Sequence, residues 1–249
     1  MSAGDALAAR IMADGRRCSL TSSILTEWAG KGTPRQREHL AAFLAEEAAA
    51  RDASRRARLL KAARIPAPKD LAGYDWSPVR LPATLPRGDL ESLAFLDARQ
   101  DLVLAGDVGC GKTHLAAALA RQAALAMRPA RFATAAGLVM ELRRAKTEGR
   151  LDKVLAGLAR FDLLVIDELG YLPIDAEGAR LLFQAVSQAY ETQSLIITTN
   201  LPFAAWGTIF GDEHMAAAII DRLAHHGHHI KFTGTSYRAR NALMRANPQ

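Results

Sequence analysis

The feature that most constrains the fold is a glycine-rich loop between two apolar segments, in the stretch LVLAGDVGCGKTHLAAALA at residues 102–120. From Gly106 to Thr113 the chain fits the pattern G-x-x-x-x-G-K-[ST]. Residues without bulky side chains let successive backbone N–H groups point at a phosphate, and the following helix adds its positive N-terminal end. The loop lies between a predicted strand and a predicted helix, the context that this motif demands, and a chance glycine turn is the alternative.

The loop predicts a site for ATP and Mg²⁺. Lys112 is expected to lie against the β- and γ-phosphates, and Thr113 to offer its hydroxyl to Mg²⁺. Cys110 is interpreted as a small loop residue. The residues expected to contact the nucleotide are Gly106, Asp107, Val108, Gly109, Cys110, Gly111, Lys112, Thr113 and His114.

A pair of acidic residues closes a second apolar strand candidate, in FDLLVIDELGYLP. Asp167 is placed to hold Mg²⁺ through its water shell, and Glu168 to polarise the attacking water. An acidic pair at this position could instead start a helix or a turn. Two adjacent acids favour an ATP-hydrolysing protein over many P-loop kinases and carriers.

Short β-rich runs alternate with helical stretches along the second part of the chain. The strand candidates are DLVLAG, ARFATA, DLLVIDE, SLIITTN and HHIKFTG, and the helical stretches between them are KTHLAAALARQAALAM, GLVMELRRAKTEGRLDKVLAGLA and EGARLLFQAVSQAYE. Apolar strands that alternate with helices indicate a parallel sheet covered on both faces. The sequence therefore predicts an α/β fold.

A helical and basic segment precedes that fold. Residues 33–63 are rich in Ala, Leu, Glu and Arg, contain no Gly, and have only the opening Pro34, so they predict a helix that begins near this proline. The following segment contains five prolines, which exclude a regular helix. We place a domain boundary there, between a helical domain at residues 1–66 and an ATPase domain at 67–249.

Basic residues gather in two places, although the net charge is only +6. Such faces bind phosphate without reading bases, so each group is a candidate surface for a polyanion such as a nucleic acid, and a solvated helix face is the alternative for each. No aromatic-rich surface indicates a preference for single strands. The first group is Arg51, Arg55, Arg56, Arg58, Lys61 and Arg64, and the second is Arg143, Arg144, Lys146 and Arg150.

Composition argues against several other classes of protein. Cys18 and Cys110 are the only cysteines, so neither a disulfide framework nor a cysteine-based zinc site is supported. No apolar run reaches the roughly 20 residues that span a bilayer, and the first residues lack the order of a signal peptide, so we expect a cytoplasmic protein without a membrane partner. We expect no metal at His225–His229, because no nearby acid or cysteine completes a ligand set.

The order of motifs along the chain resembles the IstB family of AAA+ ATPases, the transposition helper proteins of IS21-type insertion sequences. The motifs are the glycine loop, VIDELGY, IITTN, Trp206 followed by FGD, DRL followed by two histidines, and SYR. They cover residues 20–240. The chain is similar, more loosely, to helicase loaders of the DnaC type.

This resemblance implies roles for three further residues. Asn200 corresponds to sensor 1, Arg222 to the arginine finger and Arg238 to the sensor 2 arginine. Taken alone, an asparagine that closes a strand is usually a turn residue, and each arginine a surface residue. The resemblance also implies a five-stranded parallel AAA+ core without a large lid, a helical N-terminal region that binds DNA or assists assembly, and Tyr74 and Trp76 near the adenine.

The function expected from residues and resemblance together is that of a DNA-binding AAA+ ATPase that helps transposition. It binds ATP and Mg²⁺ at a subunit interface, forms a homo-oligomer on duplex DNA, and delivers this target to an IS21-type transposase, with hydrolysis regulating assembly and disassembly. The alternatives are a helicase loader acting on single-stranded DNA and a nucleotide-gated DNA-binding scaffold that does not hydrolyse ATP. A small-molecule kinase is disfavoured, because no acceptor pocket can be named.

Overall fold

The computed structural model describes residues 3–190 and 192–234. Contacts between residues divide the chain into two compact units, Met1–Arg58 and Leu59–Gln249. No helix in the described residues is both long and apolar enough to cross a membrane.

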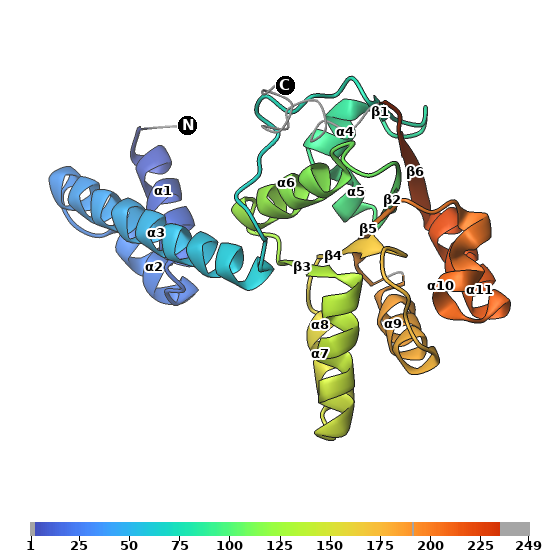
Figure 1. Ribbon diagram of the computed structural model, residues 1–249. Coiled ribbons are helices and arrows are strands. Elements are labelled where there is room, and N and C mark those ends of the chain that lie inside the picture. The colour runs from blue at the N-terminus through green and yellow to red at the C-terminus, as the bar shows by residue number, and fades with distance from the viewer. Residues whose placement is uncertain (1–2, 191, 235–249) are drawn as a thin grey trace, which may run out of the picture. The chain divides into compact units, whose positions relative to one another are not determined.

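The described part of the N-terminal unit is helical (Figure 1). Its elements are α1 (Ala3–Arg17), α2 (Ser22–Gly30) and α3 (Pro34–Ala63), of which α3 continues into the second unit. Pro34 occupies the first position of α3, as predicted, because proline lacks the N–H that a first helical residue leaves unpaired. Ile11, Ala29 and Leu44 belong to a small apolar core between these helices.

The second unit is an α/β fold, and its sheet has six strands among the described residues (Figure 1). The strands are β1 (Val79–Arg80), β2 (Asp101–Gly106), β3 (Ala130–Thr134), β4 (Leu163–Leu169), β5 (Ser194–Thr199) and β6 (Gly227–Phe232). Their order is β1-β6-β2-β5-β4-β3. The strands β2 to β6 run parallel, and β1 pairs antiparallel with β6.

All five strand candidates form strands, and these five run parallel as expected, but the sheet has one strand more than predicted. The additional strand, β1, lies in the proline-containing segment, where Val79 pairs with Phe232 and Arg80 with Lys231. Two residues are too few to show the alternation by which a strand is recognised in sequence. The open edge of β6 decides that this segment is extended.

The described helices of the second unit are α4 (Arg87–Glu91), α5 (Ala94–Asp97), α6 (Lys112–Leu125), α7 (Ala135–Thr147), α8 (Leu151–Leu158), α9 (Ala176–Ala189), α10 (Trp206–Phe210) and α11 (Glu213–His226), with a 3-10 turn at Phe203–Ala205. The helical stretch predicted at residues 137–159 is two helices. They are separated where Gly149 takes a φ of +65°, a left-handed conformation that glycine adopts readily.

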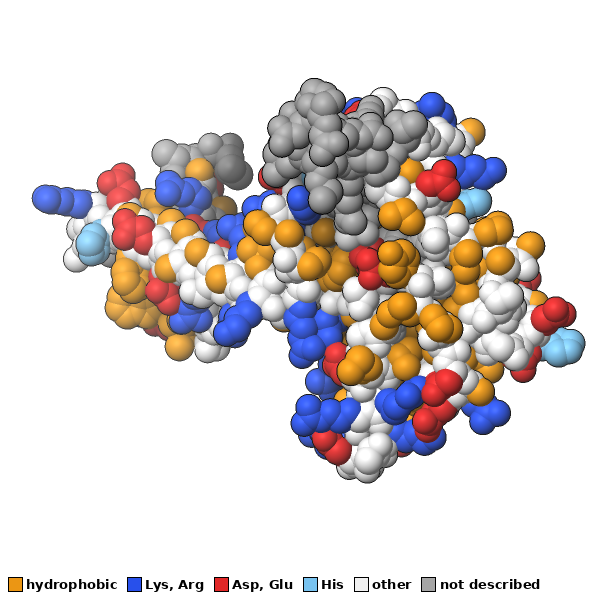
Figure 2. Space-filling model, in the orientation of Figure 1, with side chains coloured by type: hydrophobic (Ala, Val, Ile, Leu, Met, Phe, Trp, Pro, Cys, Tyr) orange, Lys and Arg blue, Asp and Glu red, His pale blue; other side chains and the backbone are white. Residues whose placement is uncertain are grey.

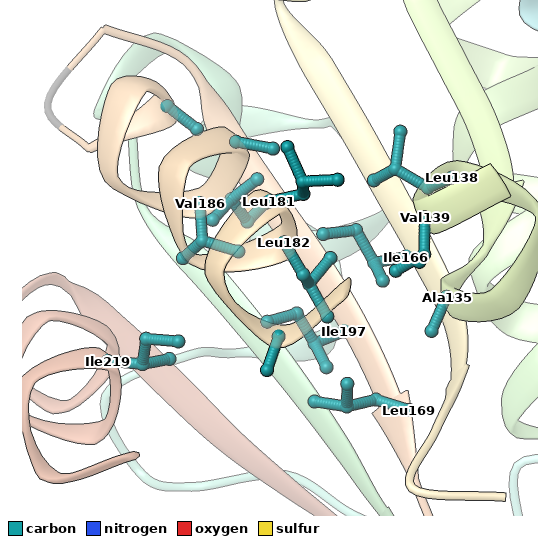
Figure 3. Packing of buried hydrophobic residues seen from close by; sticks show 14 of the residues in the cluster. Ala135, Leu138, Val139, Ile166, Leu169, Leu181, Leu182, Val186, Ile197 and Ile219 are labelled. Atoms are coloured by element: carbon teal, nitrogen blue, oxygen red, sulfur yellow. The ribbon is translucent and has the colours of Figure 1, made fainter. Parts of the chain in front are cut away.

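Helices cover both faces of the sheet, and the strands β2, β4 and β5 are buried on both sides. Val165 and Ile196 belong to the core beneath α6, whereas their neighbours Ile166 and Ile197 point to the opposite face. On that opposite face, Figure 3 shows Leu138 of α7 and Leu182 of α9 on either side of these strand residues. The carboxyl ends of the parallel strands therefore meet at one edge of a fully covered sheet.

Asp101 is a buried carboxyl group at the start of β2. It is 4% exposed, and its Oδ1 accepts a hydrogen bond of 2.8 Å from the backbone N–H of Leu195. Burial raises its pKa from the ordinary 3.8 to about 7. The folded protein therefore holds a proton that the unfolded chain releases between these two pH values, so the free energy of unfolding falls as pH rises through this window.

We expect Asp101→Asn to remove this part of the pH dependence, since the amide oxygen still accepts from Leu195 and cannot titrate. The contribution of Asp101 is on the order of 1 kcal/mol for each unit by which the pKa is raised. Urea denaturation of both proteins at about pH 5 and about pH 8 measures it. Equal losses of stability in wild type and variant on going to the higher pH would contradict this assignment.

Candidate functional site

The glycine loop lies between β2 and α6, where the sequence predicts it. Gly106 packs so closely on β6 that a Cβ atom there would lie 2.4 Å from the carbonyl oxygen of Phe232, so only glycine fits. Gly111 precedes α6 with a φ of +99°, a conformation that L side chains rarely adopt. These two glycines turn the backbone so that the N-terminal end of α6 faces the loop, which suits an anion.

Lys112 lies half-buried inside this loop. Its Nζ donates hydrogen bonds of 2.6 and 2.7 Å to the carbonyl oxygens of Gly106 and Asp107. Burial lowers the pKa of the ammonium group. Phosphate oxygens can replace the two carbonyls as acceptors, because a lysine ammonium offers donors in three directions.

Thr113 and Asp167 offer oxygen atoms to a metal ion. The Thr113 hydroxyl donates to Oδ1 of Asp167 at 3.0 Å, and Asp167 is only 2% exposed. Within residues 3–190 and 192–234, no group of three or more His, Cys, Asp or Glu side chains is arranged to hold a metal by itself. Mg²⁺ binds through one or two carboxylates and the phosphates of its substrate, so this hydroxyl and carboxylate fit it.

Glu168 owes its orientation to an irregularity in β4. The pairing of β4 with β5 shifts between Ile166 and Leu169, and Glu168 has a φ of +62°, in the left-handed region that non-glycine residues seldom occupy. Bulges of this kind turn a side chain in a new direction. Glu168 is exposed and lines the same cavity as Asp167 and Lys112.

This cavity has a volume of about 990 Å³, within the range of small-molecule sites. Its lining includes the end of the glycine loop, both acids, and residues of the segment between α3 and β1. From that segment, the Tyr74 hydroxyl donates to the carbonyl oxygen of Gly111 at 3.3 Å, and its ring lies edge-on to His114 with 5.1 Å between centroids. Burial raises the pKa of Tyr74. Trp76 contacts Tyr74 but is not among the described lining residues.

Of the residues assigned by resemblance, Asn200 and Arg222 are not among the described residues that line this cavity. Asn200 is exposed and directly follows Thr199, which pairs with Ala105 of β2 and Leu169 of β4, so it lies between the strands that carry the loop and the acids. Arg238 lies outside the described residues.

Arg222 of α11 packs on α9 rather than on the cavity. Its guanidinium carbon lies 5.6 Å from the ring centroids of both Phe183 and Tyr190. One of its terminal nitrogens is buried without a hydrogen-bond partner among the described residues. This arginine is therefore not among the described residues that line the cavity.

The first basic group is mostly exposed along the end of α3. Arg55, Arg58 and Lys61 stand at intervals of three residues there. Arg51 differs, because its Nε donates to Glu47 at 2.6 Å and its NH1 to the carbonyl of Cys18 at 2.9 Å. The remaining members, Arg56 and Arg64, are also exposed, and Arg64 lines the cavity and pairs with Glu141 at 3.3 Å.

Acidic side chains neutralise the second basic group. Lys146 pairs with Glu177 at 2.6 Å, and Arg144 pairs with Glu148 at 2.8 Å. Arg143 pairs with Asp175, and Arg150 with Glu148. Figure 2 shows basic and acidic side chains intermixed around the far end of α7. This surface offers less uncompensated positive charge than its sequence indicates.

Two residues of the site were given no role by the sequence analysis. Thr198 is 2% exposed, and its hydroxyl donates to Oδ1 of Asp167 and accepts from the backbone N–H of Glu168 at 2.9 Å. Arg131 lines the cavity, is 6% exposed, and donates to Glu141 at 2.7 Å. The only signal for Arg131 was a charged residue within a β-rich run, and Thr198 lies in the IITTN motif, of which only Asn200 was assigned a role.

The motif that begins with Trp206 serves the fold. Trp206 is fully buried, and the carboxylate of Asp212 caps α11 by accepting from the backbone N–H groups of His214 and Met215. The two histidine pairs lie on different elements, at the end of α11 and the start of β6. His228 lies 3.1 Å from the Thr84 hydroxyl, and burial lowers its pKa.

Comparisons with known proteins agree with this arrangement. The model of the IstB-like ATP binding protein family matches residues 24–245. The IS21 putative ATP-binding protein of Pseudomonas aeruginosa is 38% identical over 86% of this chain and 81% of its own length. The IS232 putative ATP-binding protein of Bacillus thuringiensis subsp. berliner is 41% identical, and the match covers 64% of each chain, just under two thirds of that relative.

Among solved structures, the crystal structure of the DnaC helicase loader has a TM-score of 0.52 and 20% identity, covering 71% of this chain and 99% of that one. This likeness shows a shared fold. The family match extends over most of the chain and confirms the resemblance seen in the order of the sequence motifs. The chain therefore belongs to the IstB-like ATP-binding protein family.

Proposed function

We propose that this protein is an ATP-hydrolysing transposition helper that assembles on duplex DNA without sequence specificity and delivers it to the transposase of an IS21-type insertion sequence. One observation carries the enzymatic part of this proposal. A single cavity brings together Lys112 and Thr113 at the start of α6 with the adjacent acids Asp167 and Glu168 at the end of β4.

Each of these side chains has a distinct task in hydrolysis. The loop N–H groups and Lys112 bind the triphosphate, with the ammonium placed for the β- and γ-phosphates. Thr113 and Asp167 would hold Mg²⁺, which would supply neutralisation of the charge that develops on the phosphates. Glu168, turned into the cavity by the bulge, orients the attacking water and accepts its proton.

The position of Arg222 supports the proposal that ATP hydrolysis depends on assembly of several copies of the chain. Its guanidinium lies against the rings of Phe183 and Tyr190, away from the cavity of its own subunit. We infer that it serves a neighbouring copy, where an arginine stabilises the charge of the transition state. Asn200, between β2 and β4, is assigned to sensing the γ-phosphate, and Arg238 to the same nucleotide.

The DNA and transposase parts of the proposal rest on charge and on family. The exposed basic residues at the end of α3 suit contact with phosphates, so we assign residues 1–66 to DNA binding and assembly. The relatives are ATP-binding proteins of insertion sequences, which supports a transposase as the partner.

Binding of the purified protein to random duplex and to single-stranded DNA of equal length tests this function. We expect cooperative duplex binding with ATP and Mg²⁺ that is weaker with ADP and falls as salt rises. Preference for single strands would favour a helicase loader instead. Equal affinity for duplex DNA with ATP and with ADP would contradict ATP-dependent assembly.

Charge variants in the same assay locate the DNA-binding surface. Replacing Arg55, Arg58 and Lys61 together with alanine is expected to weaken duplex binding for all sequences and to lower the slope of log affinity against log salt by about 0.9 for each phosphate that the variant no longer neutralises. The matched control replaces Arg143, Arg144 and Lys146, whose charges are paired with acids. A larger loss of affinity in the control would move the DNA surface to α7.

A further inference from the structure

Thr198 on β5 connects the two acidic residues of the cavity through one hydroxyl group. That hydroxyl donates its proton to Oδ1 of Asp167 and accepts from the backbone N–H of Glu168 at 2.9 Å. A threonine hydroxyl has a single proton, so the hydroxyl that donates to Asp167 can only accept from the N–H of Glu168. Asp167 thus receives two hydroxyl groups on the same oxygen atom, from Thr198 and from Thr113.

The side chains of Thr198 and Asp167 meet because they lie on the same face of the sheet. Ile196 and Val165 both belong to the core on the α6 face, and side chains two residues further along a strand point to the same face. Thr198 and Asp167 therefore share the face on which Thr113 begins α6. The hydroxyl of Thr199, one residue later, instead donates a hydrogen bond to the carbonyl oxygen of Leu169 at 2.9 Å.

The second hydrogen bond of Thr198 supports the bulge in β4. The shift of pairing between Ile166 and Leu169 takes Glu168 out of the regular ladder. Buried backbone N–H groups need a partner, and the Thr198 hydroxyl accepts from that of Glu168. Since Glu168 has a left-handed φ of +62°, this hydrogen bond helps to hold a conformation that is costly without support.

We propose that Thr198 is a positioning residue for the magnesium–nucleotide site, which fixes the Asp167 carboxylate and the backbone of Glu168. This inference rests on the proposed ATPase function. Thr198 does not touch the nucleotide. It acts through Asp167 on metal binding and through Glu168 on the attacking water.

Thr198→Val tests the proposal, because valine has nearly the same shape and lacks the hydroxyl. Loss of a residue that orients a metal ligand typically costs 10–100-fold in metal affinity or activity. We therefore expect the Mg²⁺ concentration for half-maximal binding of a fluorescent ATP analogue to rise about 10-fold or more, and kcat to fall by about 10–100-fold. Affinity for the analogue without Mg²⁺ should stay within about threefold of wild type, since Lys112 and the loop are untouched.

Two further variants separate positioning from packing. Thr198→Ser keeps the hydroxyl and should restore the Mg²⁺ dependence. Ser194→Ala is the matched control, because Ser194 is a fully buried hydroxyl at the other end of β5 that donates to the carbonyl of Phe95 at 3.3 Å. It should leave the Mg²⁺ dependence unchanged. If Thr198→Val does not fold, Thr198→Cys, which offers only a weak S–H donor, replaces it.

The outcomes distinguish this inference from the proposed function. If wild type does not hydrolyse ATP, the ATPase proposal fails, and the Mg²⁺ dependence of nucleotide binding still tests Thr198. A hydroxyl-free variant with the Mg²⁺ dependence of wild type would overturn the positioning role, as would an equal change in Ser194→Ala.

Discussion

Replacing Lys112 with alanine is expected to lower the affinity for ATP by about 100-fold and to abolish ATP-dependent DNA binding. Hydrogen bonds to charged groups contribute about 1.5–3 kcal/mol, and the ammonium lies inside the loop, where it can reach two phosphates. A loss of about 3 kcal/mol corresponds to roughly 100-fold in affinity. Equilibrium titration with a fluorescent ATP analogue measures it.

Lys153→Ala is the control for this change, because Lys153 is exposed on α8 and is not among the described residues that line the cavity. It should bind the analogue as wild type does. Unaltered affinity in Lys112→Ala would remove the glycine loop from nucleotide binding and with it the basis of the proposed function.

Replacing Glu168 with glutamine should separate hydrolysis from binding. The amide has the shape of the carboxylate but cannot accept the proton of the attacking water, and the loss of such a group typically costs 10²–10⁴-fold in rate. ATP affinity should stay within about threefold of wild type, because Lys112 and Asp167 remain. Complexes with duplex DNA formed in ATP should consequently dissociate more slowly. Phosphate release and DNA dissociation, measured on the same protein, check both effects.

Glu213→Gln serves as the control, since Glu213 is an exposed acid in the first turn of α11. If wild type releases phosphate no faster than Glu168→Gln, hydrolysis is not the function of the site. A nucleotide-gated DNA-binding scaffold would then be the better account of the protein.

Local patterns were sufficient for the features that depend on neighbouring residues. The motif from Gly106 to Thr113 predicted a loop between a strand and a helix, and the structure has β2 before it and α6 after it. Apolar runs predicted the parallel strands β2, β4 and β5, because a strand buried on both faces has a near-continuous apolar sequence. Pro34 marked the start of α3. In each case the physical constraint acts within a few residues, so it leaves a readable signature.

Tertiary contacts decided the features that the sequence could not show. Strand β1 exists because β6 offers it an edge, and Arg143 and Lys146 of the second basic group pair with Asp175 and Glu177 at the start of α9. The residues on either side of each such contact are far apart in the chain, so no local pattern records it.

By itself, the sequence determined that this protein has a P-loop α/β fold of the IstB family and named the candidate residues of a nucleotide site. Only the tertiary structure decided how those residues are held. The carboxylate of Asp167 is shared by Thr113 from α6 and Thr198 from β5, which meet because parallel strands bring their carboxyl ends to one edge. Hydrogen bonds between side chains depend on such three-dimensional proximity, and proximity is a property of the sheet rather than of any one segment.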